Sequence, residues 1–195
     1  MDYADEIPIR LKKMRRDQAY SDIKGEGIFI RDQLIRFSPK VVLERLELYL
    51  PEGFIEMPEE FAAMKYPSVN RPQMILTSLD GSTNFAFNLL TEGDVPYERI
   101  GGLAGQMKGL LRRSDPSYVF EREEMGRLSN GSPIYMFDHR SFGVDEKLYN
   151  MVCFTAFPCG VVHGVFNCLE RDMEQWRGAA WQAFLTMCEA EKTIG

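Results

Sequence analysis

The segment from Lys147 to Cys168 constrains the fold most, because it predicts two long strands joined by a tight loop. The strands are expected at Leu148–Phe157 and Val161–Cys168, on either side of a Pro-Cys-Gly turn. Apolar side chains occupy both faces of both strands. A strand that is apolar on both faces lies inside a layered domain and is covered from above and below. This pair therefore predicts a sheet buried between two other layers.

Further short strands precede this pair, and residues 44–50 among them alternate, with Leu46, Leu48 and Leu50 on one apolar face. Asp80-Gly81 and Asn130-Gly131 predict hairpin turns, because both positions of a tight turn of this kind favour positive φ. The links between strands are too short for the crossovers that parallel pairs need, so the sheet should be mainly antiparallel. The additional strands are expected as two short ones within 24–37, then Glu44–Leu50, Met74–Ser78, Thr83–Leu90, Tyr118–Met125 and Ile134–Ser141.

Three helices are expected at Pro58–Lys65, Val95–Arg113 and Met173–Glu191. Asp172 is the expected N-cap of the last helix, and Gln175 completes a capping box. Together the elements predict an α+β fold, with a mainly antiparallel β-sheet flanked by helices in an α/β/α sandwich. Residues 41–195 are expected to form this single domain. Residues 1–40 are expected to be an N-terminal extension, with a short hairpin packed on the core.

Composition favours a cytoplasmic protein that does not bind nucleic acid. The 195 residues have a net charge of −6, whereas nucleic-acid binders usually show a basic surface. No run approaches the ~18 apolar residues of a membrane span, and the first twenty residues lack the apolar core of a signal peptide. The four cysteines have no metal-ligand spacing and are expected to be reduced. The basic cluster at residues 12–16, flanked by acidic residues, is interpreted as a solvated helical face.

The segment Leu79–Phe85 is the strongest candidate for chemistry. It resembles the metal-binding Asp-Gly-Thr-x-Asn-Phe segment of inositol-monophosphatase-like enzymes. Phosphate hydrolysis by that family needs several carboxylates around magnesium ions. Thr77 and Arg177 occupy positions where the family has carboxylates, so a plain Asp80-Gly81 hairpin is favoured. A metal-dependent phosphoester hydrolase that uses Asp80 is kept as the alternative function.

The two histidines have different expected roles. His163 alternates with valines on an internal strand and is expected to be a core residue. His139, near a strand end, is a weak acid-base candidate without an evident nucleophile. No catalytic residue, metal site or cofactor is predicted.

Two features are candidates for contact with a partner. Gly101, Gly105 and Gly109 recur every four residues on one side of a helix, where a bare stripe allows another backbone to approach closely. Close packing of this stripe on the chain's own sheet is the favoured interpretation. Trp176 belongs to the apolar stripe of the last helix, whereas Trp181 lies on a different side and is a candidate contact residue.

Several short motifs resemble a group of small uncharacterised bacterial proteins with a PsbP-like or DcrB-like fold, and the resemblance covers about Leu46 to Glu191. It implies an antiparallel sheet between helices. That fold serves mostly as a binding scaffold, in photosystem subunits, a Ran-binding import factor and secretion-effector chaperones. No catalytic motif of the group exists to be carried over. The motifs are Leu50–Phe54, Met57–Phe61, Lys65–Ser68, Asn70–Gln73, Asn150 and Phe166–Cys168.

The expected function is therefore a non-enzymatic binding protein, an adaptor or chaperone, with a protein as its partner. The 11 methionines and 13 phenylalanines suit adaptable contacts, although core filling accounts for most of them. A homodimer that buries a sheet edge is a further alternative.

Overall fold

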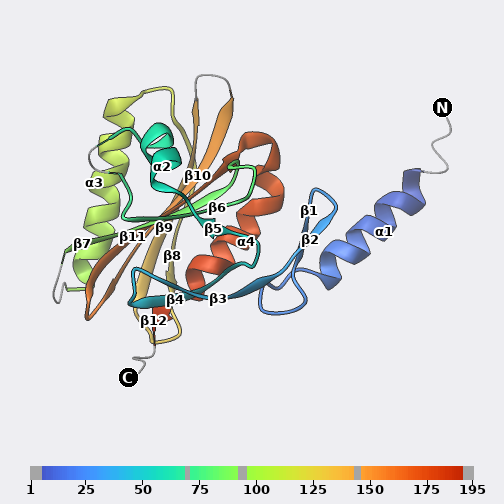
Figure 1. Cartoon of the computed structure of the whole chain (residues 1–195), viewed down its shortest axis with the longest axis horizontal. Coiled ribbons are helices and arrows are strands. Elements are labelled where there is room, and N and C mark those ends of the chain that lie inside the picture. The colour runs from blue at the N-terminus through green and yellow to red at the C-terminus, as the bar shows by residue number, and fades with distance from the viewer. Residues whose placement is uncertain (1–5, 69–70, 92–95, 143–145, 191–195) are drawn as a thin grey trace.

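The computed structural model describes residues 6–68, 71–91, 96–142 and 146–190. Its centre is a seven-stranded sheet in the order β5-β6-β7-β11-β10-β9-β8, and every neighbouring pair is antiparallel (Figure 1). The predicted antiparallel sheet is thus confirmed. Its strands are β5 (Ile55–Glu56), β6 (Met74–Thr77), β7 (Asn84–Thr91), β8 (Val119–Arg127), β9 (Pro133–Phe142), β10 (Lys147–Phe157) and β11 (Gly160–Leu169).

Strands β10 and β11 lie in the middle of this sheet, as their two apolar faces predict. Along β10, Tyr149, Met151 and Cys153 belong to the apolar cluster on one face. Val152 and Phe154 belong to the cluster on the other face. Successive side chains of a strand point to opposite faces, so both clusters share this strand as a wall.

Different elements cover the two faces of the main sheet. Helices α2 (Glu59–Lys65) and α3 (Glu98–Ser114) lie on one face. Helix α4 (Met173–Leu185), which follows the short 3-10 helix Glu170–Asp172, lies on the other. A small sheet of order β12-β4-β3 packs beside α4. Its strands are β3 (Phe37–Val42), β4 (Leu46–Pro51) and β12 (Cys188–Glu189). The result is the expected layered α+β sandwich.

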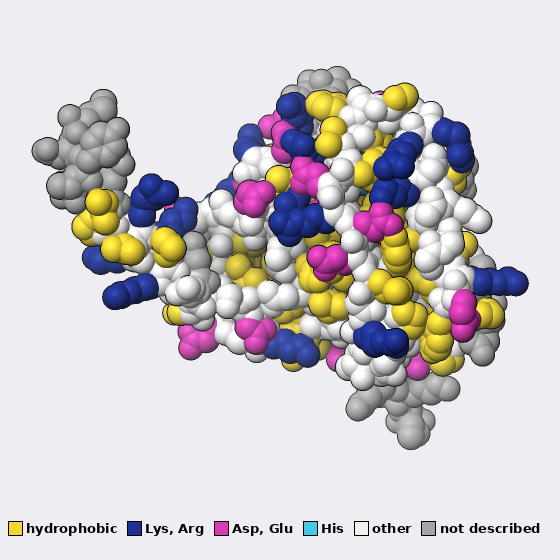
Figure 2. All heavy atoms as spheres, turned by 180° about the vertical axis from the view of Figure 1, so that it is seen from behind, with side chains coloured by type: hydrophobic (Ala, Val, Ile, Leu, Met, Phe, Trp, Pro, Cys, Tyr) yellow, Lys and Arg dark blue, Asp and Glu magenta, His cyan; other side chains and the backbone are white. Residues whose placement is uncertain are grey.

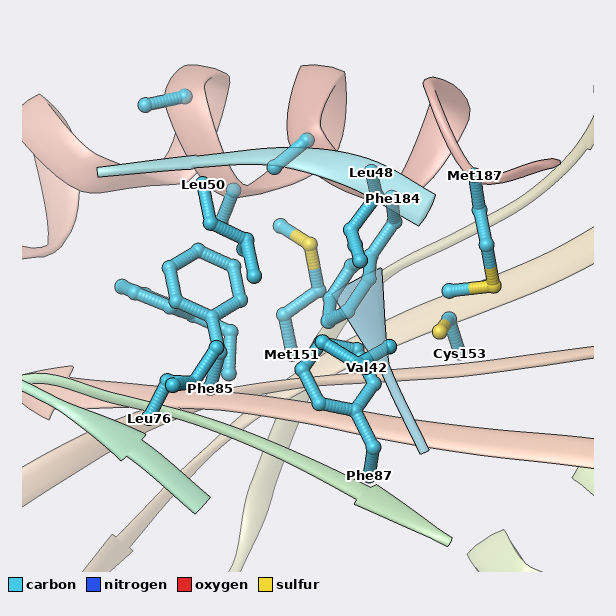
Figure 3. Close-up of a cluster of buried hydrophobic side chains, with 14 of the residues drawn as sticks. Val42, Leu48, Leu50, Leu76, Phe85, Phe87, Met151, Cys153, Phe184 and Met187 are labelled. Atoms are coloured by element: carbon cyan, nitrogen blue, oxygen red, sulfur yellow. The ribbon is translucent and has the colours of Figure 1, made fainter. Parts of the chain in front are cut away.

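The main core fills the space between the two sheets and α4 (Figure 3). Leu48 and Leu50 of β4 point into it, and both are fully buried as the alternation of residues 44–50 predicts. Phe184 enters from α4 and meets Phe85 and Phe87 of β7, with ring centroids 5.8 and 6.4 Å away. The small sheet and α4 together therefore form one layer that covers this face of the main sheet.

The N-terminal part of the chain packs against this layer. Strands β1 (Ile28–Ile30) and β2 (Gln33–Ile35) form the expected hairpin, with Arg31 and Asp32 at φ 49° and 61° in its turn. The Arg31 guanidinium pairs with the Asp172 carboxylate beside α4. Helix α1 (Glu6–Ala19) projects from the body beyond this hairpin (Figure 1). The expected domain boundary after residue 40 falls within β3.

Several local predictions are wrong. The expected helix over Met173–Glu191 ends at Leu185, and β12 follows it. Asp172 is the N-cap residue of α4 as predicted, but it makes no side-chain cap bond, because its carboxylate binds Arg31. Gln175 accepts a hydrogen bond from the Arg31 amide instead of completing a capping box. Gly81 and Gly131 have positive φ, but Asp80 and Asn130 do not, so both hairpins have longer loops than the tight turn predicts.

None of the described helices is long and apolar enough to cross a lipid bilayer.

Candidate functional site

Asp80 serves the turn between β6 and β7. Its Oδ1 accepts hydrogen bonds from Ser78 Oγ at 2.6 Å, from Ser82 Oγ at 2.9 Å and from the Ser82 amide at 3.0 Å. These hydrogen bonds lower the pKa of the Asp80 carboxyl, and the bond from Ser78 contributes most. A carboxylate that folds its own loop in this way has a structural role independent of any metal.

The residues at the other metal-ligand positions of the phosphatase resemblance do not meet Asp80 around one site. Thr77 is buried in β6, whereas Arg177 of α4 pairs with Glu121 of β8 and Asp138 of β9. In the described part of the chain, no three His, Cys, Asp or Glu side chains come together as a metal-binding group.

Both histidines pack against aromatic rings, His139 buried and His163 half-buried. His163 stacks on Phe154, with ring centroids 4.7 Å apart, and His139 stacks on Phe120 at 5.3 Å. Burial lowers the pKa of each imidazole to about 4, although Asp138 opposes this effect at His139. Both rings are therefore neutral at pH 7, and His163, expected in the core, lies half-buried at its margin, where its ring contacts Phe154 and Asn88.

This burial makes stability depend on pH. Between the folded pKa near 4 and the unfolded value of about 6.5, only the unfolded chain takes up the proton, so acidification favours unfolding. We expect the free energy of unfolding to fall by about 1–2 kcal/mol per histidine between pH 7 and pH 5. Urea unfolding at both pH values measures this change. His163→Gln removes one of the two protonatable rings, so the change in the free energy of unfolding between pH 7 and pH 5 should be about half as large in this variant. The same pH dependence in the variant and the unaltered chain would contradict the account.

A buried ionic network connects α4 with β8, β9 and β10. Asp138 Oδ2 accepts a hydrogen bond from the Tyr149 hydroxyl at 2.9 Å and lies 3.2 Å from Arg177 Nε. Burial of the Arg177 guanidinium opposes its charge, but hydrogen bonds to Tyr149 and Glu121 outweigh burial, and the pKa of Arg177 is raised. Burial, with Asp138, raises the pKa of Tyr149. The network therefore holds a permanently charged arginine beside a neutral tyrosine.

The same network shapes the edge of the main sheet. The ladder between β8 and β9 is irregular between Phe120 and Glu123, where the Arg122 amide donates to Asp138 Oδ1 at 2.8 Å. Glu121, in this bulge, pairs with Arg177 and with Arg140. A bulge of this kind bends an edge strand and redirects its side chains. Asp138 and Arg177 are thus positioned to fix the shape of β8.

A groove of about 380 Å³ lies between α4 and β8. We call it the β8 groove. Trp181 is half-buried in the wall of this groove. Part of its side chain packs against the main core, and the rest is accessible from the groove. This position agrees with the prediction that Trp181 lies on a different side of the helix from the buried Trp176. The groove is lined by Arg122, Glu124, Asp138, Glu174, Arg177, Gly178, Trp181 and Gln182.

The glycine stripe of α3 lies elsewhere. A Cβ atom added at Gly105 would meet no neighbour, and at Gly109 it would meet only Arg113 of the same helix. A Cβ at Gly101 would lie 4.0 Å from the Tyr135 ring. The favoured interpretation, close packing of the stripe on the sheet, is therefore wrong: Ile100 and Ala104 make that contact. Because α3 and α4 cover opposite faces, the glycines and Trp181 do not form one surface.

Comparison with known proteins identifies the fold. The cyanobacterial PsbP protein (CyanoP) from Synechocystis sp. PCC 6803 superimposes with a TM-score of 0.57, over 84% of this chain and 98% of that one, at 10% identity. The chain has a PsbP-like fold. LpqN of Mycobacterium tuberculosis, described as involved in cell envelope biogenesis, superimposes with a TM-score of 0.52, over 83% and 94% of the two chains, at 14% identity. No family model and no curated protein matches the sequence. At these identities the PsbP-like likeness concerns the fold alone.

Proposed function

We propose that this PsbP-like chain is a non-enzymatic cytoplasmic binding protein, an adaptor or chaperone, whose partner is a polypeptide that docks at the β8 groove. The observation that supports this most is the open edge of β8 beside Trp181. Strand β8 ends the seven-stranded sheet and pairs with β9 on its inner side. An open edge of this kind can accept an extended peptide as an added strand.

The regular part of β8 defines where such a peptide would lie. From Glu123 to Arg127 the ladder with β9 continues without a shift. This stretch is largely exposed, and Met125 is 73% exposed. The buried contacts of Asp138 and Arg177 fix the bulge next to it, so the edge is rigid before a partner arrives. A preformed edge lowers the ordering cost of binding.

The side chains of the groove indicate the chemistry of the partner. Trp181 offers a large half-buried ring, and tryptophan is among the residues that most often dominate binding energy. Arg122 and Glu124 on β8, with Glu174 on α4, present both signs of charge around it. The favoured partner is therefore a short extended segment with an apolar side chain over Trp181 and charged residues of both signs.

The structural roles of the reactive residues support a binding function over catalysis. Asp80 holds its turn, both histidines are neutral and stacked, and Arg177 pairs with the buried Asp138 carboxylate. The four cysteines are free thiols, which agrees with the reducing conditions of the cytoplasm.

Truncation of Trp181 tests this proposal. We expect Trp181→Ala to weaken binding of the partner about thirtyfold, the effect of losing roughly 2 kcal/mol at an interface anchor. The partner is first recovered from host cells with the unaltered chain as bait, and its affinity is then measured by titration calorimetry. Leu110→Ala, which removes an exposed side chain on the opposite face of the sheet, is the control and should bind normally.

Equal affinities for both variants would contradict the β8 groove as the site. Magnesium-dependent phosphoesterase activity that disappears in Asp80→Ala would instead support the alternative hydrolase function.

A further inference from the structure

Helix α1 has an exposed apolar stripe. Ile7, Leu11 and Met14 follow the spacing i, i+4, i+7 that places side chains on one face of a helix, and each is more than half exposed. Figure 2 shows apolar side chains gathered on this projecting helix, with basic side chains around them. An apolar stripe on a helix that stands away from the body is a surface for a partner.

The contacts of α1 with its own chain lie on its other side. Arg16 pairs with Asp32 and lies over the Phe29 ring, 4.2 Å from its centroid. Arg16 is two residues from Met14, which separates them by about 200° around a helix. The hairpin therefore holds α1 by one face and leaves the apolar stripe on the opposite face.

Charge indicates what kind of surface fits this stripe. Residues 6–19 contain five basic and two acidic residues, a net charge of +3, so the rest of the chain has a net charge of −9. Arg10 and Arg15 flank the apolar stripe on either side. Opposite charges on helix and body favour contact between α1 and an acidic protein surface of this chain. They disfavour an anionic membrane, which would repel the body.

A matching acidic and apolar surface lies on α2 and the neighbouring sheet edge. We call it the α2 surface. It contains exposed Phe61 and Met64 on α2, exposed Ile55 on β5, and the acidic residues Glu56 and Glu60. On α2, Ala62 packs inward, so Glu60, Phe61 and Met64 share the outward side. The glutamates of the α2 surface are opposite in charge to the arginines that flank the α1 stripe, and each surface has exposed apolar side chains beside its charges.

The α1 of the same chain lies on the far side of the body from α2 (Figure 1). We infer that α1 of one copy docks on the α2 surface of a second copy, with Leu11 and Met14 against Phe61 and Met64. Reciprocal exchange of α1 between two copies makes this contact twice and closes the assembly as a dimer. This surface is separate from the β8 groove, so the inference goes beyond the proposed function and does not depend on it.

Sedimentation velocity of the full chain over a range of concentrations tests this inference. We expect a concentration-dependent dimer, and Leu11→Asp and Met64→Glu should each weaken it at least tenfold. Both side chains are exposed, so neither variant should alter folding. Leu110→Asp, an equally exposed change on α3, should leave the dimer intact.

A charge exchange sharpens the result. Arg15→Glu and Glu60→Lys should each weaken the dimer, and the double variant should restore much of the lost affinity. A chain that stays monomeric at every concentration overturns the inference, as does a dimer that survives both Leu11→Asp and Met64→Glu. Binding of a monomer through Leu11 to vesicles of phosphatidylglycerol would also overturn it, in favour of a lipid surface.

Discussion

Phe184→Ala is expected to lower the free energy of unfolding by about 3–5 kcal/mol, the usual cost of truncating a buried phenylalanine. The ring is fully buried, and it bridges α4 to β7 and β11. Gly164 of β11 allows this approach: a Cβ atom there would lie 2.9 Å from the Phe184 ring and 2.6 Å from Cys153 Sγ. The space left by truncation has rigid walls on the sheet side, so it should collapse little.

The midpoint and slope of urea unfolding measure this effect, and the midpoint should fall while the slope stays constant. Phe142→Ala is the matched control, because Phe142 is 49% exposed at the end of β9. We expect it to change the free energy of unfolding by less than about 1 kcal/mol. Similar losses in both variants would contradict the packing of α4 on the main sheet.

Arg177→Met is expected to cost about 3–5 kcal/mol, because it leaves a buried carboxylate without its cation. Arg177 Nε lies 3.2 Å from Asp138 Oδ2, and Asp138 is 2% exposed. Methionine fills much of the same volume, so the loss should come from charge and hydrogen bonding. Adding Asp138→Asn to this variant removes the unpaired charge and should recover part of the stability.

Arg171→Met is the control for this prediction. Arg171 pairs with Glu146 at 3.0 Å on the surface, where both side chains are about half exposed, and such pairs contribute at most about 1 kcal/mol. A small effect of Arg177→Met, or no recovery in the double variant, would contradict the described network.

The sequence predicts the sheet well, because the pattern of apolar residues along each strand indicates which of its faces is buried. Leu46, Leu48 and Leu50 share a face, and β10 is apolar on both. Strand β3 was not expected, because Pro39 interrupts its pattern, yet an edge strand tolerates proline. The predicted end of α4 is wrong because Met187 continues the apolar spacing of the helix, whereas Cys188 and Glu189 pair with β4 as β12.

The candidate site is less accessible to prediction. Arg177 was interpreted only as a mismatch to a metal ligand, since its partners Asp138 and Tyr149 lie 39 and 28 positions away in sequence and meet it only through the register of β9 with β10. The α1 stripe had a signal in the spacing of Ile7, Leu11 and Met14, but the basic residues between them favoured a solvated helical face. The glycine stripe has the spacing of a packing surface, and only the placement of Ile100 and Ala104 shows that it faces outward.

Site-specific photo-crosslinking in host cells tests most directly the claim that the chain binds a polypeptide at the β8 groove. A photoreactive phenylalanine replaces Trp181 in one variant and Gln106, exposed on α3 across the sheet, in another. We expect one discrete polypeptide to be crosslinked from position 181 and not from position 106. No crosslink from position 181, or the same crosslink from both positions, would contradict the account.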